Sequence, residues 1–282
     1  MSEYFEPWFE YQQPIVRQLA FVVASPNIIQ ALPEQLHTQH TFELHSNDFW
    51  KDLYLRYIPR LKFLDQHPEE LITFIQQLKS TRLGLRFEYL MWFWLQDAAY
   101  HHYQLIGHSI QIIDGKDTLG ELDFLLINTQ TQEVEHWEVA LKYYLAEADY
   151  SLSHWYGLNR SDTLERKLKH FTQKQFQFKS ALGHTIQKRI AILKGQLFIP
   201  INRPENTLPL FVNPYREVGQ WGTQLFCSRY YRLNRLEWIC PNEITDPIYA
   251  AFWCNGLYRN FKTKQHYMYR QPPILSICVK KM

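Results

Sequence analysis

Residues 120–145, GELDFLLINTQTQEVEHWEVALKYYL, contain the pattern that decides the fold. Two runs of alternating polar and apolar residues flank TQTQ, which predicts two antiparallel strands joined by a hairpin. Alternation puts Asp123 opposite Phe124 and Glu138 opposite Trp137, so the two acids come side by side if the strands pair through TQTQ. A charged group among apolar neighbours costs free energy unless it is paired or binds metal. The pattern therefore indicates either the solvated face of an ordinary hairpin or a site.

Neighbouring carboxylates repel each other, and a shared proton or a divalent cation relieves the repulsion. Oxygen ligands that leave room for bound water suit Mg²⁺ or Mn²⁺. We therefore expect Asp123 and Glu138 to bind Mg²⁺ or Mn²⁺. Lys142 is on the face of Glu138, where an ammonium group would orient a water molecule or offset negative charge that develops on phosphate.

The flanking segments predict a mixed protein of the α/β (α+β) class. The first eighty residues favour helices, with Pro59 marking an interruption of the amphipathic stretch 47–64. Residues 82–102 are apolar almost all round, which predicts a buried helix, and they include Glu88. Three strands follow, then a basic helix and a fourth strand, at 103–113, 120–129, 133–145, about 162–178 and 194–200.

This order divides the chain into three regions. Residues 1–80 form an N-terminal helical region, residues 81–200 a core, and residues 201–282 a mixed C-terminal region packed on the core. In the last region only short strands are predicted, at 210–214 and 235–241.

The composition is that of a folded globular protein, with 46% hydrophobic and 21% charged residues. The net charge is only +2, yet residues 158–195 contain nine Lys or Arg against two acids, and residues 250–282 contain six against none. Two basic segments on an otherwise acidic chain indicate either a surface for a polyanion or a solvated basic face.

Location and metal chemistry follow from simpler features. The four cysteines lie far apart without a C-x-x-C pair, so they indicate neither a zinc site nor a disulfide framework. The N-terminus is acidic and aromatic and lacks the basic start of a secretory signal. The apolar run 19–24 is too short to span a bilayer. We expect a cytoplasmic protein with no membrane association.

An acid at the end of one strand and a Glu-x-Lys-like pattern on the next, between a helix with Glu and a basic helix, resemble the PD-(D/E)XK nuclease superfamily. The resemblance implies a restriction-endonuclease-like αβββαβ core. It implies that Asp123 and Glu138 are the two acids of the motif, that the Val139 carbonyl contacts the metal, and that Glu88 is the helix acid of some members.

A closer resemblance is to a family of bacterial proteins known only as a domain of unknown function. The stretches that carry it are VRQLAFVVASP, RFEYL, GELDFLL, HWEVALKYYL, YGLNRSDTLERKL and KGQLFIP. It implies a fold and no activity.

The chain departs from the superfamily pattern in one respect. The superfamily places its lysine two residues after the second acid, where this chain has Ala140, and Lys142 lies two residues further, roughly 13 Å from Glu138 along a regular strand. A bulge could shorten this gap, or Lys142 could reach back. Alternatively, Lys167 on the following helix supplies the cation.

Three functions are consistent with these residues. The first is a metal-dependent nuclease that hydrolyses phosphodiester bonds of DNA, whose backbone would contact the basic helix through Arg160, Arg166, Lys167, Lys169 and Lys174. The second is a catalytically degenerate nuclease fold that binds nucleic acid, which the displaced lysine favours. The third is a carboxylate-pair hydrolase for a sugar or peptide, a chemistry that has no use for basic helices.

Overall fold

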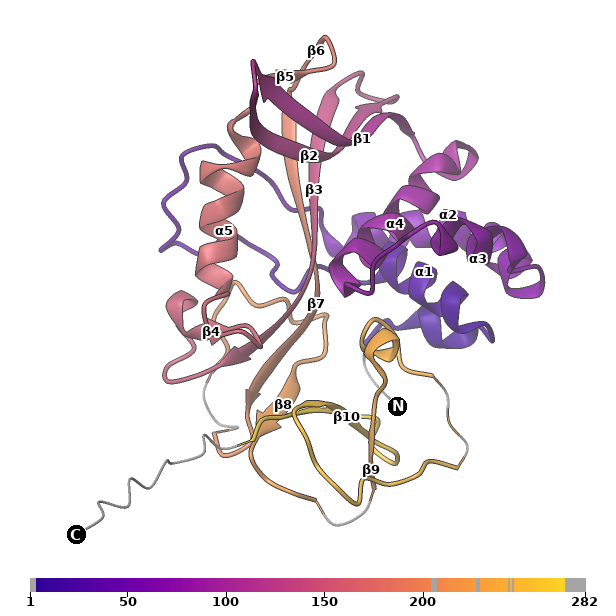
Figure 1. Ribbon diagram of the computed structural model, residues 1–282, viewed down its shortest axis with the longest axis vertical. Helices are drawn as coiled ribbons and strands as arrows, with labels where there is room; N and C mark the ends of the chain where they lie inside the picture. The colour runs from indigo at the N-terminus through magenta and orange to yellow at the C-terminus, as the bar shows by residue number, and fades with distance from the viewer. Residues whose placement is uncertain (1–3, 204–206, 227–228, 243, 245, 272–282) are drawn as a thin grey trace.

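The computed structural model describes residues 4–203, 207–226, 229–242, 244 and 246–271. Figure 1 shows a long twisted sheet seen close to edge-on, with the N-terminal helices on one face and α5 on the other. The C-terminal strands extend the lower end of the same sheet (Figure 1). The protein is thus of mixed α+β class, with helices on both sides of one sheet.

The bounds of the elements are as follows. The α-helices are α1 (Pro14–Ala24), α2 (Asn47–Gln66), α3 (Glu69–Gln76), α4 (Leu83–Gln96) and α5 (Leu164–Gln173). The main strands are β1 (Tyr103–Asp114), β2 (Asp117–Asn128), β3 (Val134–Ala146) and β7 (Lys188–Pro200). Shorter strands are β4 (Trp155–Tyr156), β5 (Ser180–Ala181), β6 (His184–Thr185), β8 (Gly219–Gly222), β9 (Tyr230–Arg232), β10 (Gly256–Asn260) and β11 (His266–Tyr269). Five 3₁₀ turns complete the described elements: Pro7–Glu10, Ala98–Tyr100, Leu152–His154, η4 (Gln175–Gln177) and η5 (Arg235–Trp238).

The sheet has the order β1-β2-β3-β7-β8-β11-β10-β9, with β4 paired to β3. β1, β2 and β3 pair antiparallel, while β3 and β7 pair in parallel over most of their length. The succession of α4, β1, β2, β3, α5 and β7 follows the predicted order of helix, three strands, helix and strand. β3 is therefore central, with β2 on one side and β7 on the other.

The pairing of β2 with β3 ends next to Asp123 and Glu138. Their pairing runs from Ile127 opposite Val134 to Phe124 opposite Trp137 and ends there. Beyond that point β2 stays paired with β1, and β3 stays paired with β7. Because the register places Asp123 next to Glu138, both acids lie where the two strands diverge.

The two faces of β3 pack against different layers. Trp137, Val139 and Leu141 join the core formed with α1, α2 and α4. Ala140 and Tyr144 pack instead with α5. Each face buries its apolar groups against its own helices, and Glu138 lies on the α5 side between His136 and Ala140.

A glycine permits the tight junction of β3 with β7. Gly195 lies opposite Lys142 with a φ of +126°, and a Cβ at this position would be 1.9 Å from the Lys142 carbonyl oxygen. Only glycine adopts this backbone conformation without strain and leaves room for the neighbouring strand.

The predicted interruption at Pro59 is wrong, because α2 continues through it. A proline inside a helix removes one hydrogen bond to the carbonyl four residues earlier, here that of Leu55. Leu55 and Pro59 are on the exposed side of α2, where water can satisfy that carbonyl, while Tyr57, Leu61 and Leu64 on the other side are fully buried. Packing of the buried side outweighs the lost bond.

Three other local predictions need correction. The basic helix is shorter than residues 162–178: Thr163 caps it by accepting a hydrogen bond from the Arg166 amide, and after Gln173 the chain turns into η4. The strand predicted at 235–241 is wrong, because Asn234 and Glu237 form a capping box that starts the turn η5. The strand predicted at 210–214 is reduced to one bridge, between Val212 and Ile29.

In the described part of the chain, none of the helices is long and apolar enough to span a bilayer.

Candidate active site

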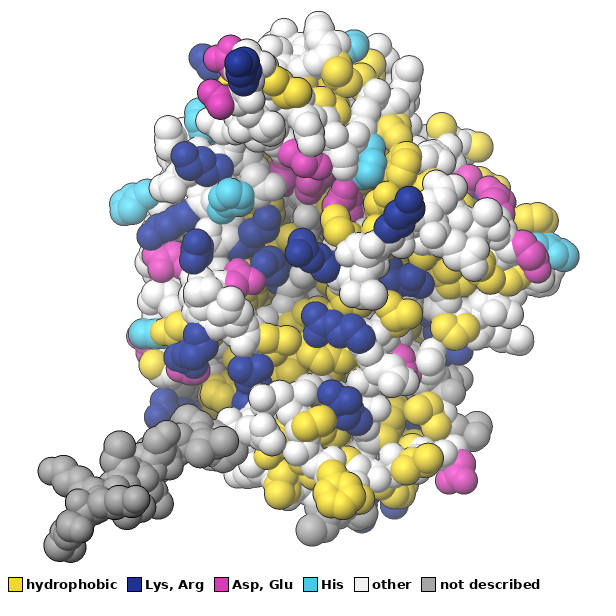
Figure 2. Space-filling view, in the orientation of Figure 1, with side chains coloured by type: hydrophobic (Ala, Val, Ile, Leu, Met, Phe, Trp, Pro, Cys, Tyr) yellow, Lys and Arg dark blue, Asp and Glu magenta, His cyan; other side chains and the backbone are white. Residues whose placement is uncertain are grey.

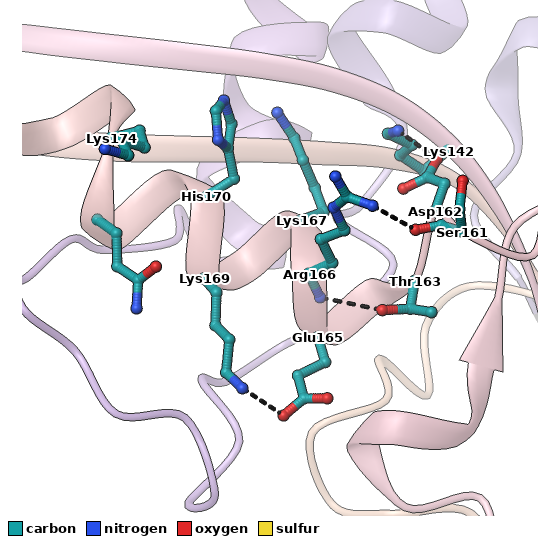
Figure 3. Close-up of a pocket in the computed structure, with 11 residues that line it drawn as sticks. Lys142, Ser161, Asp162, Thr163, Glu165, Arg166, Lys167, Lys169, His170 and Lys174 are labelled. Carbon is teal, nitrogen blue, oxygen red and sulfur yellow. Dashed lines mark hydrogen bonds and ion pairs between the residues drawn. The ribbon is translucent and has the colours of Figure 1, made fainter.

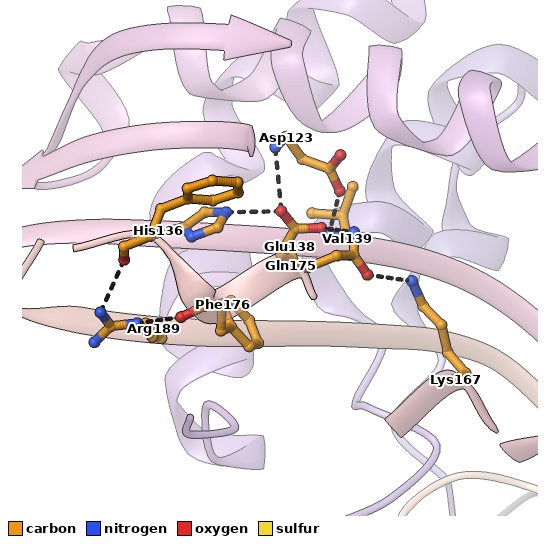
Figure 4. Close-up of polar contacts among 9 residues, drawn as sticks. Asp123, His136, Glu138, Val139, Lys167, Gln175, Phe176 and Arg189 are labelled. Carbon is orange, nitrogen blue, oxygen red and sulfur yellow. Dashed lines mark hydrogen bonds and ion pairs between the residues drawn. The ribbon is translucent and has the colours of Figure 1, made fainter. Parts of the chain in front are cut away.

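Asp123 and Glu138 meet at the point where β2 and β3 diverge. The Asp123 amide faces Glu138 Oε1 at 3.5 Å, and Asp123 Oδ2 accepts a hydrogen bond of 2.8 Å from the Val139 amide. Figure 4 shows the two carboxylates converging between the strands. The side chain of Asp123 thus replaces the main-chain partner that β3 would otherwise find on β2.

The carbonyl of Val139 belongs to the same edge of β3. In a strand, the N–H and C=O of one residue point to the same side, and the Val139 N–H points to Asp123. Its carbonyl oxygen is therefore directed to the edge on which the two strands part, beside the carboxylate of Asp123.

Glu138 is fully buried and surrounded by hydrogen-bonding groups. Its Oε1 lies 2.7 Å from His136 Nε2, and its Oε2 accepts a hydrogen bond from the side-chain amide of Gln175. Burial lowers the pKa of His136 to about 3, so the ring is neutral. Among the described residues, His136 Nδ1 is without a hydrogen-bond partner.

Burial raises the pKa of both acids, and the charge of Glu138 adds to the effect at Asp123. The pKa of Glu138 is raised to about 8, chiefly because the carboxyl group is buried, although Lys167 opposes the shift. The pKa of Asp123 is also raised, first by burial, then by Glu138 and then by Glu88. At neutral pH the pair therefore retains a proton that a divalent cation would displace.

Lys167, rather than Lys142, approaches the carboxylates. Lys167 Nζ donates a 2.9 Å hydrogen bond to Gln175 Oε1, so Gln175 connects this lysine to Glu138 (Figure 4). Burial lowers the pKa of Lys167, and the charges of Glu138 and Asp123 oppose that shift. Lys142 instead forms an ion pair of 2.6 Å with Asp162.

Glu88 lies on α4, on the other side of the sheet from Glu138. Its Oε1 is 2.8 Å from His108 Nε2 and accepts a 3.3 Å hydrogen bond from Ser109 Oγ. The His108 ring stacks on Trp92, with ring centres 4.3 Å apart. Glu88 is near enough to raise the pKa of Asp123, but its carboxylate already has two partners from β1.

A basic pocket of about 720 Å³ opens beside this cluster along the exposed side of α5 (Figure 3). Its cations are Lys142, Arg166, Lys167, Lys169 and Lys174, and its two acids, Asp162 and Glu165, are ion-paired with Lys142 and Lys169. Asp123 and Glu138 do not line it, but Lys167 contributes to both.

The electrostatic character of the pocket is visible in His170. Its pKa is lowered by partial burial and then by Lys167, Lys174, Arg166 and Lys142. Four cations act on one ring, which indicates a locally positive field. Figure 2 shows Lys and Arg side chains spread over this face and around its central hollow, with acidic side chains gathered above.

Arg160 lies outside the basic pocket. Its guanidinium group is ion-paired with Glu147 and stacks over the Tyr156 ring at 4.2 Å. Arg166 donates a hydrogen bond from Nη1 to the Ser161 carbonyl. Of the five basic residues predicted to contact nucleic acid, Arg166, Lys167, Lys169 and Lys174 line one pocket, and Arg160 is committed elsewhere.

The family described as Domain of unknown function (DUF1853) matches residues 17–279. The chain belongs to the DUF1853 family. No curated protein and no solved structure matches this chain. The chemistry of this member of the DUF1853 family therefore has to be inferred from its own residues.

The donor set of the DUF1853 chain fits a hydrated hard cation. Two carboxylates and the Val139 carbonyl are oxygen ligands, and Mg²⁺ in proteins keeps several waters when one or two carboxylates bind it. In the described part of the chain, no three His, Cys, Asp or Glu side chains are placed to share one ion. The site thus fits Mg²⁺ or Mn²⁺ and does not fit a fully protein-ligated Zn²⁺.

Gln175 and His108 contact the predicted site residues, although their sequence context did not indicate it. Gln175 follows the end of α5, and no local pattern indicates that its amide would join Lys167 to Glu138. His108 looks like one polar residue in an apolar strand, and only the packing of α4 on β1 brings it to Glu88. In both cases the signal is a contact between elements that are distant along the chain.

Proposed function

We propose that the protein is a metal-dependent nuclease that hydrolyses phosphodiester bonds of DNA. The observation that carries the proposal is the pair formed by half-buried Asp123 and fully buried Glu138, which shares Lys167 with a basic pocket. The resemblance to the PD-(D/E)XK nuclease superfamily supports it, since Asp123, Glu138 and Val139 match that motif. A restriction-endonuclease-like core around β1, β2, β3 and β7 is part of the same proposal.

The roles of the residues follow from their positions. Asp123, Glu138 and the Val139 carbonyl would hold Mg²⁺ or Mn²⁺, which supplies an activated water and charge neutralisation at the phosphate. Gln175 fixes the orientation of Glu138 by donating to Oε2 while it accepts from Lys167. Lys167 then presents its ammonium group next to the carboxylates, where negative charge develops during in-line attack on phosphorus.

The basic pocket would bind the DNA backbone. Arg166 and Lys174 are exposed, and neither is in an ion pair with a described carboxylate. Phosphate contacts of this kind position a nucleic acid and contribute affinity that depends on salt, with little sequence information.

The test is cleavage of plasmid and linear DNA by the purified chain with Mg²⁺ or Mn²⁺. We expect cleavage that EDTA abolishes and that Asp123→Ala removes, while Glu69→Ala, an exposed acid of α3, cleaves like the wild type. Full activity of Asp123→Ala, or absence of both cleavage and binding at low salt in the wild type, would refute the proposal.

A second candidate is nucleic-acid binding without turnover. The observation that favours it is the full burial of Glu138, both of whose oxygens already have protein partners. It predicts salt-dependent DNA binding that survives Glu138→Ala, and no cleavage with either metal. The same experiment therefore separates the two candidates.

A further inference from the structure

A second basic pocket, of about 300 Å³, lies at the junction of the C-terminal strands with the core. Three arginines line it, Arg232 from β9, Arg235 from η5 and Arg270, which follows β11. The rest of its lining includes Leu158, Trp238 and Asn255 and contains no acid. The pocket thus combines two guanidinium groups that are neighbours in the sequence, those of Arg232 and Arg235, with that of Arg270, which is 35 residues further along the chain.

The three guanidinium groups keep donors available for a ligand. Arg270 donates to the Leu158 carbonyl at 3.1 Å, and Arg232 donates to the Asn255 carbonyl at 3.4 Å. Arg235 stacks over the Trp238 ring at 4.5 Å. In the described ranges no carboxylate is ion-paired with any of the three. A guanidinium group has five N–H donors, so each arginine retains several.

One residue that lines this three-arginine pocket, Trp238, contacts β3, the strand that contains Glu138. Tyr143, the residue after Lys142 in β3, donates a 2.7 Å hydrogen bond to the Trp238 carbonyl, and the two rings meet edge to face at 5.4 Å. Residues 157–163 connect the two pockets, because Leu158 lines the second and Ser161 to Thr163 line the first.

The length of β3 between Glu138 and Tyr143 can be compared with the dimensions of duplex DNA. Glu138 and Tyr143 are five residues apart in one strand, or about 17 Å at the usual rise per residue. Successive base pairs of duplex DNA advance about 3.4 Å along the axis, so about 17 Å corresponds to about five base pairs. The stretch of β3 between Glu138 and the residue that contacts Trp238 is therefore as long as about half a turn of duplex DNA.

We propose that Arg232, Arg235 and Arg270 form a second phosphate-binding site for the same nucleic acid, separate from the site of the phosphate at the carboxylates. The proposal rests on the proposed function and adds a binding site to it. Planar guanidinium groups match phosphate oxygens in pairs, which suits this pocket to the backbone rather than to the bases.

The test measures binding of a labelled DNA duplex of about 20 base pairs in EDTA at several salt concentrations between about 50 and 200 mM. The variant is Arg232→Gln/Arg235→Gln, which leaves the Arg270 bond to Leu158 intact. The control is Arg56→Gln/Lys62→Gln, two exposed residues of α2 outside both pockets. Each phosphate contact contributes about 0.9 to the slope of log K against log salt.

We expect the arginine variant to lose between about one and two from that slope and the control to lose none. Equal slopes for the wild type, the variant and the control would overturn the proposal while leaving the nuclease proposal intact, provided that the wild type binds and cleaves. Absence of binding by the wild type would overturn the second site, and absence of cleavage as well would overturn both proposals. If the double variant fails to fold, as judged by its circular dichroism, the single change Arg235→Glu is used with the same criterion.

Discussion

The first half of β3 buries two glutamates, and their surroundings differ. Glu135 is 2% exposed and Glu138 is 0% exposed. Glu135 accepts hydrogen bonds of 3.0 Å from Asn128 Nδ2 and 2.7 Å from Trp137 Nε1, so both oxygens have neutral amide or indole donors. Glu138 instead faces Asp123, a second carboxylate, and a neutral histidine.

The difference separates a structural acid from a candidate catalytic one. At Glu135 the strands are still paired, and the carboxylate ties the β2–β3 turn to β3. At Glu138 the strands have diverged, and the carboxylate meets a group that it repels. Burial alone therefore does not mark the site, whereas burial beside a like charge does.

The largest expected effect tests the role of Glu138. Glu138→Gln keeps the size of the side chain and removes the charge, so we expect DNA cleavage to fall about 10³-fold, which is about 4 kcal/mol of transition-state stabilisation. Its free energy of unfolding without metal should change little at neutral pH, because Glu138 retains a proton there and the amide replaces a neutral carboxyl group. Cleavage rates and urea unfolding of the same preparation measure both. If Glu138→Gln unfolds readily but retains its specific activity, Glu138 is a structural residue and not a catalytic one.

The next effect distinguishes the two lysines. Lys167→Ala should lower cleavage about 10²-fold, because it removes the ammonium group next to the carboxylates. Lys142→Ala should lower it less than about fivefold, since a partly exposed ion pair such as that with Asp162 contributes at most about 1 kcal/mol. Single-turnover rates at saturating protein give the ratio. A greater loss in Lys142→Ala than in Lys167→Ala would assign the role to Lys142.

Glu135→Gln tests the other buried glutamate of β3. One of its two donors, from Asn128 or Trp137, must lose its acceptor, so we expect a loss of about 1–3 kcal/mol in the free energy of unfolding. The specific activity of the folded fraction should remain that of the wild type. Unfolding midpoints measure the loss of stability, and active-site titration by metal gives the specific activity of the folded fraction. A Glu135→Gln protein that is as stable as the wild type but no longer cleaves would contradict the prediction.

The smallest effect is on the pH dependence of stability without metal. Because the pKa of Glu138 is raised to about 8, the folded state retains a proton that the unfolded state has released above its ordinary pKa. Stability therefore falls as pH rises towards about 8, by about 1 kcal/mol between about pH 7 and pH 8. Asp123→Asn/Glu138→Gln should lack this component, and Mg²⁺ should remove it from the wild type. A wild type that parallels the double variant over this range contradicts the shared-proton picture.

Much of the core was predictable from local pattern. The alternation in 120–145 placed Trp137 and Glu138 on opposite faces, and the TQTQ turn set a register that brings Asp123 to Glu138. Two predictions outside this pattern, the interruption at Pro59 and the strand at 235–241, were wrong. Pro59 does not interrupt α2, because the packing of its buried side compensates for the lost bond. Residues 235–241 form a turn rather than a strand because Asn234 and Glu237 cap it.

The sequence by itself determined which side chains share a face of each strand, since side-chain alternation is a local property of the backbone. It therefore placed both carboxylates together and left Lys142 and Lys167 as alternatives. Only the tertiary structure decided that Lys167 and Gln175 approach Glu138, that Lys142 pairs with Asp162, and that Arg270 shares a pocket with Arg232 and Arg235. These contacts depend on how α5 and the C-terminal strands pack against β3, and packing between segments far apart in the chain leaves no local periodicity to read.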